Sequence, residues 1–154
     1  MKKSAGLLLY RKVNGNLEVL LVHPGGPFWA KKDSGAWSIP KGEYSESEEP
    51  LAAAKREFVE ELGLDVPEIE WEELGAVKYS GKEVVAWAGE SDLDLTGFKS
   101  GTFEMEWPPK SGRKTEFVEV DRVEWFGLDE AKEKIVAGQR EFLDRLSDFV
   151  TEKS

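Results

Sequence analysis

Hydrophobic and polar positions along the chain follow two different periods, and each period predicts a different kind of element. Two short apolar runs, 4–10 and 17–22, flank Asn14-Gly15-Asn16, a segment typical of a turn, so they predict a first pair of strands. Later segments predict more strands and two closing helices. The further strands are expected at 70–78, 83–88, 103–107 and within 118–126, and the helices at 128–137 and 140–150.

The clearest element is a helix between Pro50 and Gly63. Pro50 suits the first helical position, where its missing N–H is no loss. Gly63 suits the left-handed residue that commonly follows a helix. Apolar residues recur at helical spacing between the two and predict one buried stripe, formed by Leu51, Ala54, Phe58 and Leu62.

Strands with helices before, between and after them predict an α/β fold, an α/β/α sandwich with a mixed sheet. No internal repeat or low-complexity linker interrupts the sequence, so we expect a single domain over residues 1–154. No apolar run approaches the roughly 18 residues that a membrane span needs. The start of the chain has too short an apolar stretch for a signal peptide. Cysteine is absent, which fits a cytoplasmic location.

Composition narrows the chemistry. With 21 basic and 31 acidic residues the net charge is −10, so nucleic acid is not expected to bind through a broad electrostatic face. One histidine and no cysteine exclude a zinc site of the usual nitrogen and sulfur type, and they exclude a cysteine nucleophile. A metal in this protein therefore needs oxygen ligands, which points to Mg²⁺ or Mn²⁺.

Three glutamates lie on one side of the expected helix. At about 100° per residue, Glu57, Glu60 and Glu61 form a cluster beside the apolar stripe, where they would crowd one another at the edge of a groove. Such a set can supply most of a hard-cation site, and Arg56 can reach Glu60 across one turn. Taken alone, the same pattern also fits a solvated acidic helix face.

The surrounding residues favour the metal site. From Gly42 the specified positions are Gly42, Glu48, Arg56, Glu57, Phe58, Glu60, Glu61, Gly63 and Leu64. This order resembles the Nudix box, the signature of the Nudix hydrolases, with every defining position filled. The preceding Trp37-Ser38-Ile39-Pro40-Lys41 is also similar to the flank found in many members of the family.

The resemblance implies a loop, a helix and a loop in an α/β/α sandwich, with Mg²⁺ or Mn²⁺ on the helix glutamates and water attacking phosphorus. Glu57, Glu60 and Glu61 would be the metal-binding and base-forming carboxylates. The main-chain oxygen of Lys41 or Gly42 would be a further ligand. Arg56 would orient a carboxylate, and Glu48 would be a peripheral acid.

Features outside the box are candidates for reading the substrate. Phe28, Trp29 and Trp37 lie in a loop rich in Gly and Pro, where an aromatic ring could stack on a nucleobase or plug the loop from below. Lys41 is a further candidate contact. Lys110 and Arg113 belong to a basic island, 110–114, that fits either a phosphate clamp or a solvated hairpin tip.

Four single residues carry weaker hints. Glu119 or Glu116 could bring one more carboxylate to the metal, as loop glutamates do in several Nudix enzymes, and the spacing from Glu119 to Trp125 is similar to that in diadenosine tetraphosphate hydrolases. Tyr79 resembles a tyrosine of the dinucleoside polyphosphate hydrolases, although it also fits a core position. His23, at a strand end, fits a structural role better than a phosphate contact.

The sequence therefore indicates a Nudix pyrophosphohydrolase that cleaves a diphosphate linkage in a nucleoside diphosphate derivative. Dinucleoside polyphosphates and nucleoside triphosphates are the favoured small-molecule substrates. A nucleotide sugar, an RNA 5′ end and an inositol pyrophosphate are the alternatives. A rival of another class is a Nudix domain that senses a nucleotide without hydrolysing it, which the intact glutamates argue against. Assembly as a homodimer stays open.

Overall fold

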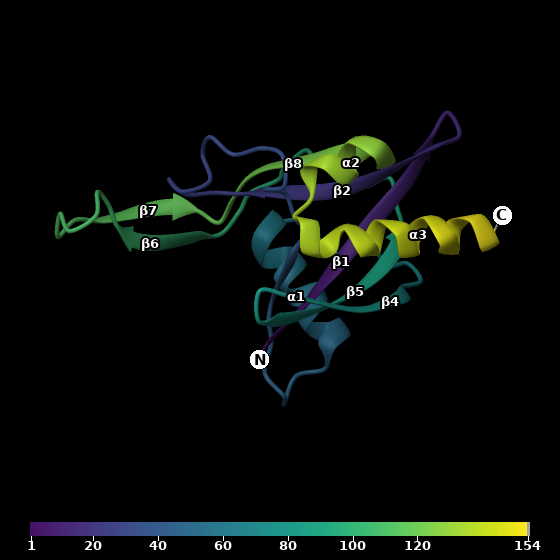
Figure 1. The fold of residues 1–154 in the computed structure, drawn as a ribbon, viewed down its shortest axis with the longest axis horizontal. Helices are drawn as coiled ribbons and strands as arrows, with labels where there is room; N and C mark the ends of the chain where they lie inside the picture. Colours follow the sequence, from purple (N-terminus) through teal and green to yellow (C-terminus); the bar gives the residue numbers. More distant parts are fainter. Residues whose placement is uncertain (154) are drawn as a thin grey trace.

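The computed structural model describes residues 1–153; Ser154, the last residue of the expected domain, lies outside them. The strands are β1 (Lys2–Val13), β2 (Asn16–Pro24), β3 (Lys41–Glu43), β4 (Glu72–Tyr79), β5 (Lys82–Glu90), β6 (Thr102–Glu106), β7 (Lys114–Val118) and β8 (Val120–Gly127). The helices are α1 (Pro50–Leu62), α2 (Leu128–Lys134), a 3₁₀ turn η1 (Ala137–Gln139) and α3 (Arg140–Lys153) (Figure 1).

The main sheet is mixed, as the sequence predicted. Its order is β4-β5-β1-β2-β8, with β3 added beside β1. β1 runs parallel to β5 and antiparallel to β2 and β3. Because β1 is long, its two ends have different neighbours along one edge: β3 pairs with Ser4–Gly6, and β2 pairs with Tyr10–Val13. β3 is thereby fixed against β1 immediately before the segment that leads into α1.

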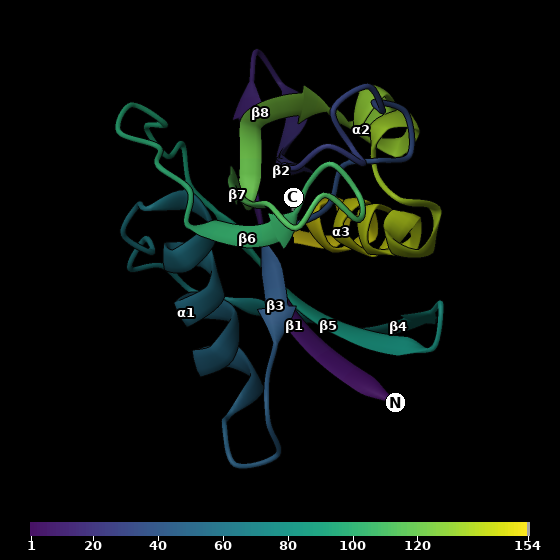
Figure 2. The same ribbon diagram turned by 90° about the vertical axis from the view of Figure 1, so that its left-hand side faces the viewer.

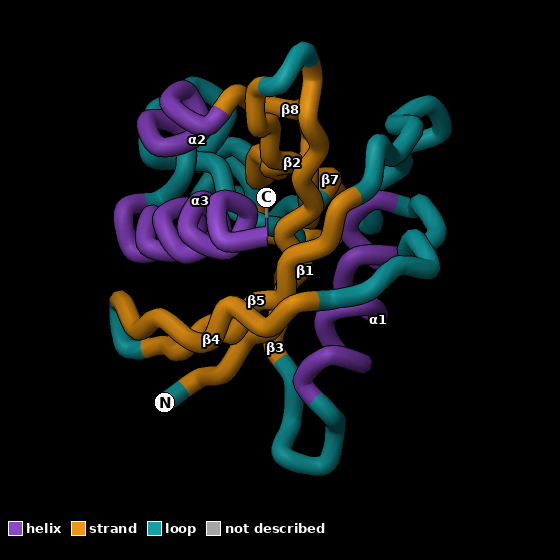
Figure 3. The backbone as a smooth tube through the Cα atoms, turned by 90° about the vertical axis from the view of Figure 1, so that its right-hand side faces the viewer, coloured by secondary structure: helices purple, strands orange, loops and turns teal. Residues whose placement is uncertain are grey.

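Helices cover both faces of this sheet (Figures 2 and 3). Alternate residues of β1 enter two separate apolar clusters: Leu8 packs in the one that contains α2 and α3, whereas Leu7 packs in the one that contains α1. Side chains of a strand point alternately to opposite faces, so a strand buried on both sides is apolar throughout. That burial explains the uninterrupted apolar run at 7–9 and confirms the α/β/α layering.

The helix α1 begins and ends where its end residues predict. Pro50 occupies its first turn, and Gly63 follows it at φ 63°, in the left-handed region that a side chain disfavours. Ala54, Phe58 and Leu62 are buried as expected. Leu51 is only partly buried, because it lies in the first turn at the margin of the α1 cluster. The helix phase inferred from the sequence is otherwise correct.

One region differs from the expectation. The segment 118–126 was expected to contain one strand, but the chain forms β7 before Glu119 and β8 after it. β7 pairs with β6 in a separate two-stranded ribbon, here called the arm, which projects away from the main sheet (Figure 1). The first closing helix also ends early, at Lys134, and a 3₁₀ turn follows it. Among the helices of residues 1–153, none combines the length and apolar character needed to cross a bilayer.

Candidate functional site

The last turns of α1 place Glu57, Glu60 and Glu61 near the end of the arm that joins the main sheet, where the N–H of Gly101 donates to the carbonyl of Glu60. Glu61 lies on the inner side, where its Oε1 accepts a 2.8 Å hydrogen bond from the backbone N–H of Lys41. Burial raises the pKa of Glu61 to about 8, and the nearby carboxylates of Glu57 and Glu119 add to the rise. Burial also lowers the pKa of the Lys41 ammonium. Burial thus disfavours the charged forms of both Glu61 and Lys41, so the Lys41 ammonium does not fully neutralise the Glu61 carboxylate.

Glu119 joins this group from the linker between β7 and β8. Its backbone is held on two sides: its N–H donates to the carbonyl of Gly101 at 2.8 Å, and its carbonyl accepts from Gly25 at 2.9 Å. Gly101 N–H in turn donates to the carbonyl of Glu60. Burial, then Glu57 and Glu60, raises the pKa of the Glu119 carboxyl. Four glutamates from two segments thus share one electrostatic environment.

Glu116 lies elsewhere. It belongs to β7, is exposed, and stands opposite Glu104 in the arm. Of the two loop glutamates considered from the sequence, the structure brings Glu119 to the helix glutamates and leaves Glu116 on the arm.

Arg56 holds the outer carboxylates. Its guanidinium binds both oxygens of Glu48, at 2.8 and 2.9 Å. The same group donates to Glu57 at 2.7 Å and to Glu60 at 3.3 Å. These bonds raise the pKa of Arg56 and lower that of Glu48. Arg56 is placed to orient Glu57 and Glu60, and Glu48 in turn orients Arg56.

The carboxylate oxygens of Glu57, Glu60, Glu61 and Glu119 are the type of ligand that a hard divalent cation prefers. Gly42 leaves room for them: a Cβ at this position would lie 2.0 Å from the Glu57 carboxylate. Within residues 1–153, no three carboxylate or histidine side chains converge closely enough to form a ligand shell as they stand. Glu57 and Glu60 are instead turned toward Arg56, so binding a cation requires their side chains to rotate.

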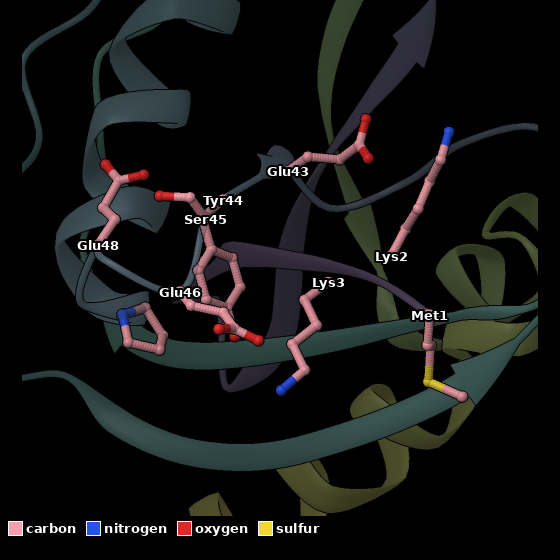
Figure 4. Close-up of a pocket in the computed structure, with 9 residues that line it drawn as sticks. Met1, Lys2, Lys3, Glu43, Tyr44, Ser45, Glu46 and Glu48 are labelled. Carbon is pink, nitrogen blue, oxygen red and sulfur yellow. The ribbon is translucent and has the colours of Figure 1, made fainter.

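Two hollows border this region. One of about 130 Å³ lies directly against Glu61 and Glu119 and is floored by Ser38, Ile39 and Val120. A larger one, of about 480 Å³, lies at the start of α1 (Figure 4). Its lining carries Lys2 and Lys3 together with Glu43, Glu46 and Glu48, and none of the four glutamates described above. The smaller hollow is the better candidate for the reacting group, because Glu61 and Glu119 line it.

The aromatic residues before the box divide into two kinds. Trp29 is 38% exposed and Phe28 is 60% exposed, so both present ring surface to solvent. Trp37 is 1% exposed, with its Nε1–H donating to Asp33 at 2.8 Å and Phe126 packed edge-on against its ring. The prediction that Trp37 contacts substrate is therefore wrong, because no ring face is open for stacking.

Other predicted substrate contacts lie away from the glutamates. The Tyr79 hydroxyl accepts a 2.9 Å hydrogen bond from Gln139, and its ring packs against the α2/α3 cluster, which is the core position considered as its alternative. Lys110 and Arg113 lie at the tip of the arm and are exposed. Arg113 precedes Glu119 by six residues, so along extended backbone the two are about 20 Å apart.

The arm has an apolar face that the sequence pattern did not predict. Phe103 and Phe117 are paired across the two strands, with ring centroids 6.0 Å apart. Trp107 stacks edge-on with Phe28 at 5.5 Å. This face therefore extends the exposed aromatic surface of the 24–37 loop. The alternation of apolar and acidic residues in 103–107 indicates a strand with one apolar face. The pairing of that face with Phe117 depends on β7, which the sequence pattern did not predict.

A mixed sheet between helices is a fold shared with solved Nudix structures. The chain superposes on the Ap4A hydrolase of C. elegans in a binary complex with a TM-score of 0.68, at 24% identity, covering 99% of each chain. The NUDIX domain of Shewanella oneidensis NrtR complexed with ADP ribose gives a TM-score of 0.63 at 17% identity, covering 96% of this chain and 87% of that one. At these identities the likeness shows the fold alone.

Sequence comparison establishes the family. The profile of the NUDIX domain matches residues 2–146. An RNA pyrophosphohydrolase of Caulobacter vibrioides (strain NA1000 / CB15N) is 28% identical over 138 residues, which cover 81% of this chain and 78% of that protein. The chain belongs to the Nudix hydrolase family, which confirms the resemblance inferred from residues 42–64.

Proposed function

We propose that this Nudix hydrolase cleaves the diphosphate linkage of a nucleoside diphosphate derivative with the help of Mg²⁺ or Mn²⁺. Dinucleoside polyphosphates and nucleoside triphosphates are its favoured substrates. The observation that carries the proposal is the pair Glu61 and Glu119, which borders a hollow of about 130 Å³ and whose carboxyl pKa values are raised by burial and by the nearby Glu57 and Glu60. Carboxylates gathered in this way repel one another, and a cation with its phosphate ligand relieves that repulsion.

Each residue has a distinct part in this proposal. Glu57, Glu60, Glu61 and Glu119 would hold the cation, together with the carbonyl oxygen of Lys41 or Gly42. When bound, such a cation offsets charge on phosphate oxygens and lowers the pKa of an attacking water. Glu57 or Glu60 would accept the proton from that water. Arg56, which bonds only Oε1 of each glutamate, would orient them while the other oxygen of each turns toward the cation.

The similar proteins support a nucleotide substrate. A solved neighbour is named Ap4A hydrolase, and a relative is named RNA pyrophosphohydrolase, so both names point to phosphoanhydride bonds in nucleotide-type molecules. Trp29 and Phe28 could stack on a base, since both are exposed on the loop whose first residues contact Glu119. Stacking of this kind contributes about 1–3 kcal/mol per base in single-strand binders.

A second candidate substrate is the triphosphorylated 5′ end of an RNA. The cationic tip of the arm favours it: Arg113, with Lys110 and Lys114 close to it in the chain, lies about 20 Å along the strand from Glu119, farther than a compact mononucleotide at the glutamates needs to reach. Phosphates of a longer chain could meet these side chains. The net charge of −10 opposes the same substrate.

The deciding experiment measures phosphate and nucleotide release across a panel of diadenosine polyphosphates, nucleoside triphosphates, nucleotide sugars and 5′-triphosphate RNA. We expect turnover with Mg²⁺ or Mn²⁺, none in excess EDTA, and recovery when the metal is returned. Full turnover in EDTA would refute the oxygen-ligand metal site. Tight nucleotide binding without hydrolysis of any compound would support the sensor alternative.

Two further points belong to the same proposal. A cytoplasmic location is supported by the lack of cysteine, since disulfides are common in oxidising compartments. A homodimer is the assembly to test first, because twofold dimers are the commonest oligomers. Light scattering after size-exclusion chromatography gives the mass directly.

A further inference from the structure

The single histidine of the chain is buried at the end of β2. His23 is 0% exposed, and each of its ring nitrogens has one close partner. Nδ1 lies 2.7 Å from Oδ1 of Asp121 in β8, and Nε2 lies 2.6 Å from the main-chain oxygen of Lys32. Trp37 packs edge-on against the imidazole with ring centroids 5.2 Å apart. The ring is thus fixed between a strand of the main sheet and the middle of the 24–37 loop.

Both partners of this imidazole are hydrogen-bond acceptors. A main-chain oxygen cannot donate, and neither can a carboxylate. A neutral imidazole has one N–H, so it can satisfy only one of the two contacts. Both contacts coexist when both nitrogens carry a proton and His23 is an imidazolium.

The charge on Asp121, in direct contact with the ring, favours an imidazolium, whereas burial of the ring opposes it. Asp121 supplies the opposing charge, and it is itself 3.8 Å from the guanidinium of Arg122. Arg122 also lies over Trp37, which donates to Asp33, and Asp33 forms an ion pair with Lys134. Of these charged groups from the loop, β8 and α2, Asp121 is the one whose carboxylate contacts the ring.

The contacts of His23 with Asp121 and Lys32 join the two segments that meet at the site. Lys32 lies in the loop that exposes Phe28 and Trp29, and Asp121 follows Glu119 by two residues. A second link is parallel to these contacts, because the N–H of Gly25 donates to the carbonyl of Glu119 at 2.9 Å. The loop is therefore fastened near its start and at its middle to the same strand segment.

We propose that His23, as an imidazolium bonded to Asp121 and Lys32, is a positioning residue that holds the 24–37 loop in its substrate-binding conformation against the Glu119 segment. The consequence for catalysis rests on the proposed function. His23 contacts none of the four glutamates, so its loss leaves the chemistry intact. A loosened loop must be ordered by the substrate, which weakens binding in the ground state and the transition state alike.

The protonation state is tested directly by ¹⁵N NMR. With one histidine in the chain, selective ¹⁵N-histidine labelling gives a single pair of ring signals. We expect both nitrogens of the wild-type protein to be protonated at pH 7. In Asp121→Asn the amide can donate to Nδ1, so one ring nitrogen should lose its proton. A wild-type ring with one unprotonated nitrogen would overturn the proposal, whatever substrate the enzyme uses.

Kinetics test the positioning role. His23→Phe keeps the ring packing and removes both donors, and Asp121→Ala removes the acceptor at a partly exposed position. Each variant should raise KM about tenfold, with kcat within about twofold of wild type, since each removes one or two hydrogen bonds. Asp121→Asn keeps a bond to the ring and should restore most of the affinity. Lys31→Ala, at an exposed site in the same loop, is the matched control.

Hydrogen exchange of the 24–37 amides separates this role from a general loss of stability. His23→Phe and Asp121→Ala should speed exchange in that loop while leaving β1 and β5 protected. Unchanged KM and exchange in folded variants would overturn the proposal, and so would a fall in kcat at constant KM. If the wild-type protein turns over no compound of the panel, the proposed function fails, but the NMR and exchange results still decide the role of His23.

Discussion

The backbone N–H of Lys41 donates a 2.8 Å hydrogen bond to the carboxylate of Glu61. Twenty residues separate the two in sequence, so the bond exists only because β3 pairs with β1 and α1 packs on the same sheet. It holds Glu61 inward while its neighbour Glu60 faces outward to Arg56. The glutamates of the motif therefore point two ways: Glu61 inward to the Lys41 backbone and Glu60 outward to Arg56.

Removal of a carboxylate charge should separate chemistry from folding. We expect Glu57→Gln and Glu61→Gln each to lower kcat by at least about 100-fold, because each removes an anionic oxygen from the cation site. Glu46→Gln, exposed before α1, is the control and should leave kcat unchanged. Circular dichroism should show the native fold in all three proteins. Near-normal rates in both active-site variants would move the chemistry elsewhere.

Gly42 should be sensitive to one added methyl group. In Gly42→Ala the new Cβ would lie 2.0 Å from the Glu57 carboxylate, so that side chain must move and its position for the cation is lost. We expect a rise in the Mg²⁺ concentration that gives half-maximal rate, together with a lower kcat. Gly127→Ala is the matched control, since a Cβ there meets nothing within 4 Å. Equal behaviour of the two variants would argue against a crowded site.

Substitution of the two tryptophans of the loop, Trp29 and Trp37, should affect different properties: substrate binding for Trp29 and stability for Trp37. Trp29→Ala should raise KM for nucleotides with little change in kcat, because stacking is equal in the ground and transition states. Trp37→Ala should instead lower the free energy of unfolding by about 3–5 kcal/mol, as expected for loss of a buried aromatic side chain. Urea titration and steady-state kinetics on both variants decide the matter. A stable Trp37→Ala protein with raised KM would contradict the buried position of this ring.

The tip of the arm offers a test of substrate length. Arg113→Ala should lower kcat/KM most for the longest polyphosphates or for RNA, because a short substrate at the glutamates does not extend about 20 Å to the tip. A series of diadenosine polyphosphates and 5′-triphosphate RNAs of increasing length measures this. The same loss at every length, or none, would make the tip a solvated turn.

Asp33 should make stability depend on pH. Its bond to Lys134, then its bond from Trp37, lower its pKa in the folded protein. A carboxyl with a lowered folded-state pKa stabilises the fold above its unfolded-state pKa, and this contribution is lost as the pH falls through the folded-state pKa. Asp33→Asn should therefore be less stable than wild type at pH 7, with the gap closing in acid. A constant gap in urea midpoints from pH 7 to pH 3 would exclude this linkage.

Local residue patterns determined much of this protein from sequence alone. Pro50 and Gly63 define α1 because their backbone preferences act within one turn, and the apolar spacing of Ala54, Phe58 and Leu62 sets which face is buried. With the helix phase known, the grouping of its glutamates follows from geometry. The family follows from the same residues.

The tertiary structure decided what depends on distant pairing. Trp29 and Trp37 are equivalent in an unfolded loop, and only packing against Phe126 and Asp33 makes Trp37 a core residue. β7 was missed because its short, charged segment is stabilised by pairing with β6 and not by a core of its own. The choice of Glu119 over Glu116 follows from that pairing, since β7 ends at Val118 and the next residue is bonded to Gly101, which is itself bonded to Glu60 in α1.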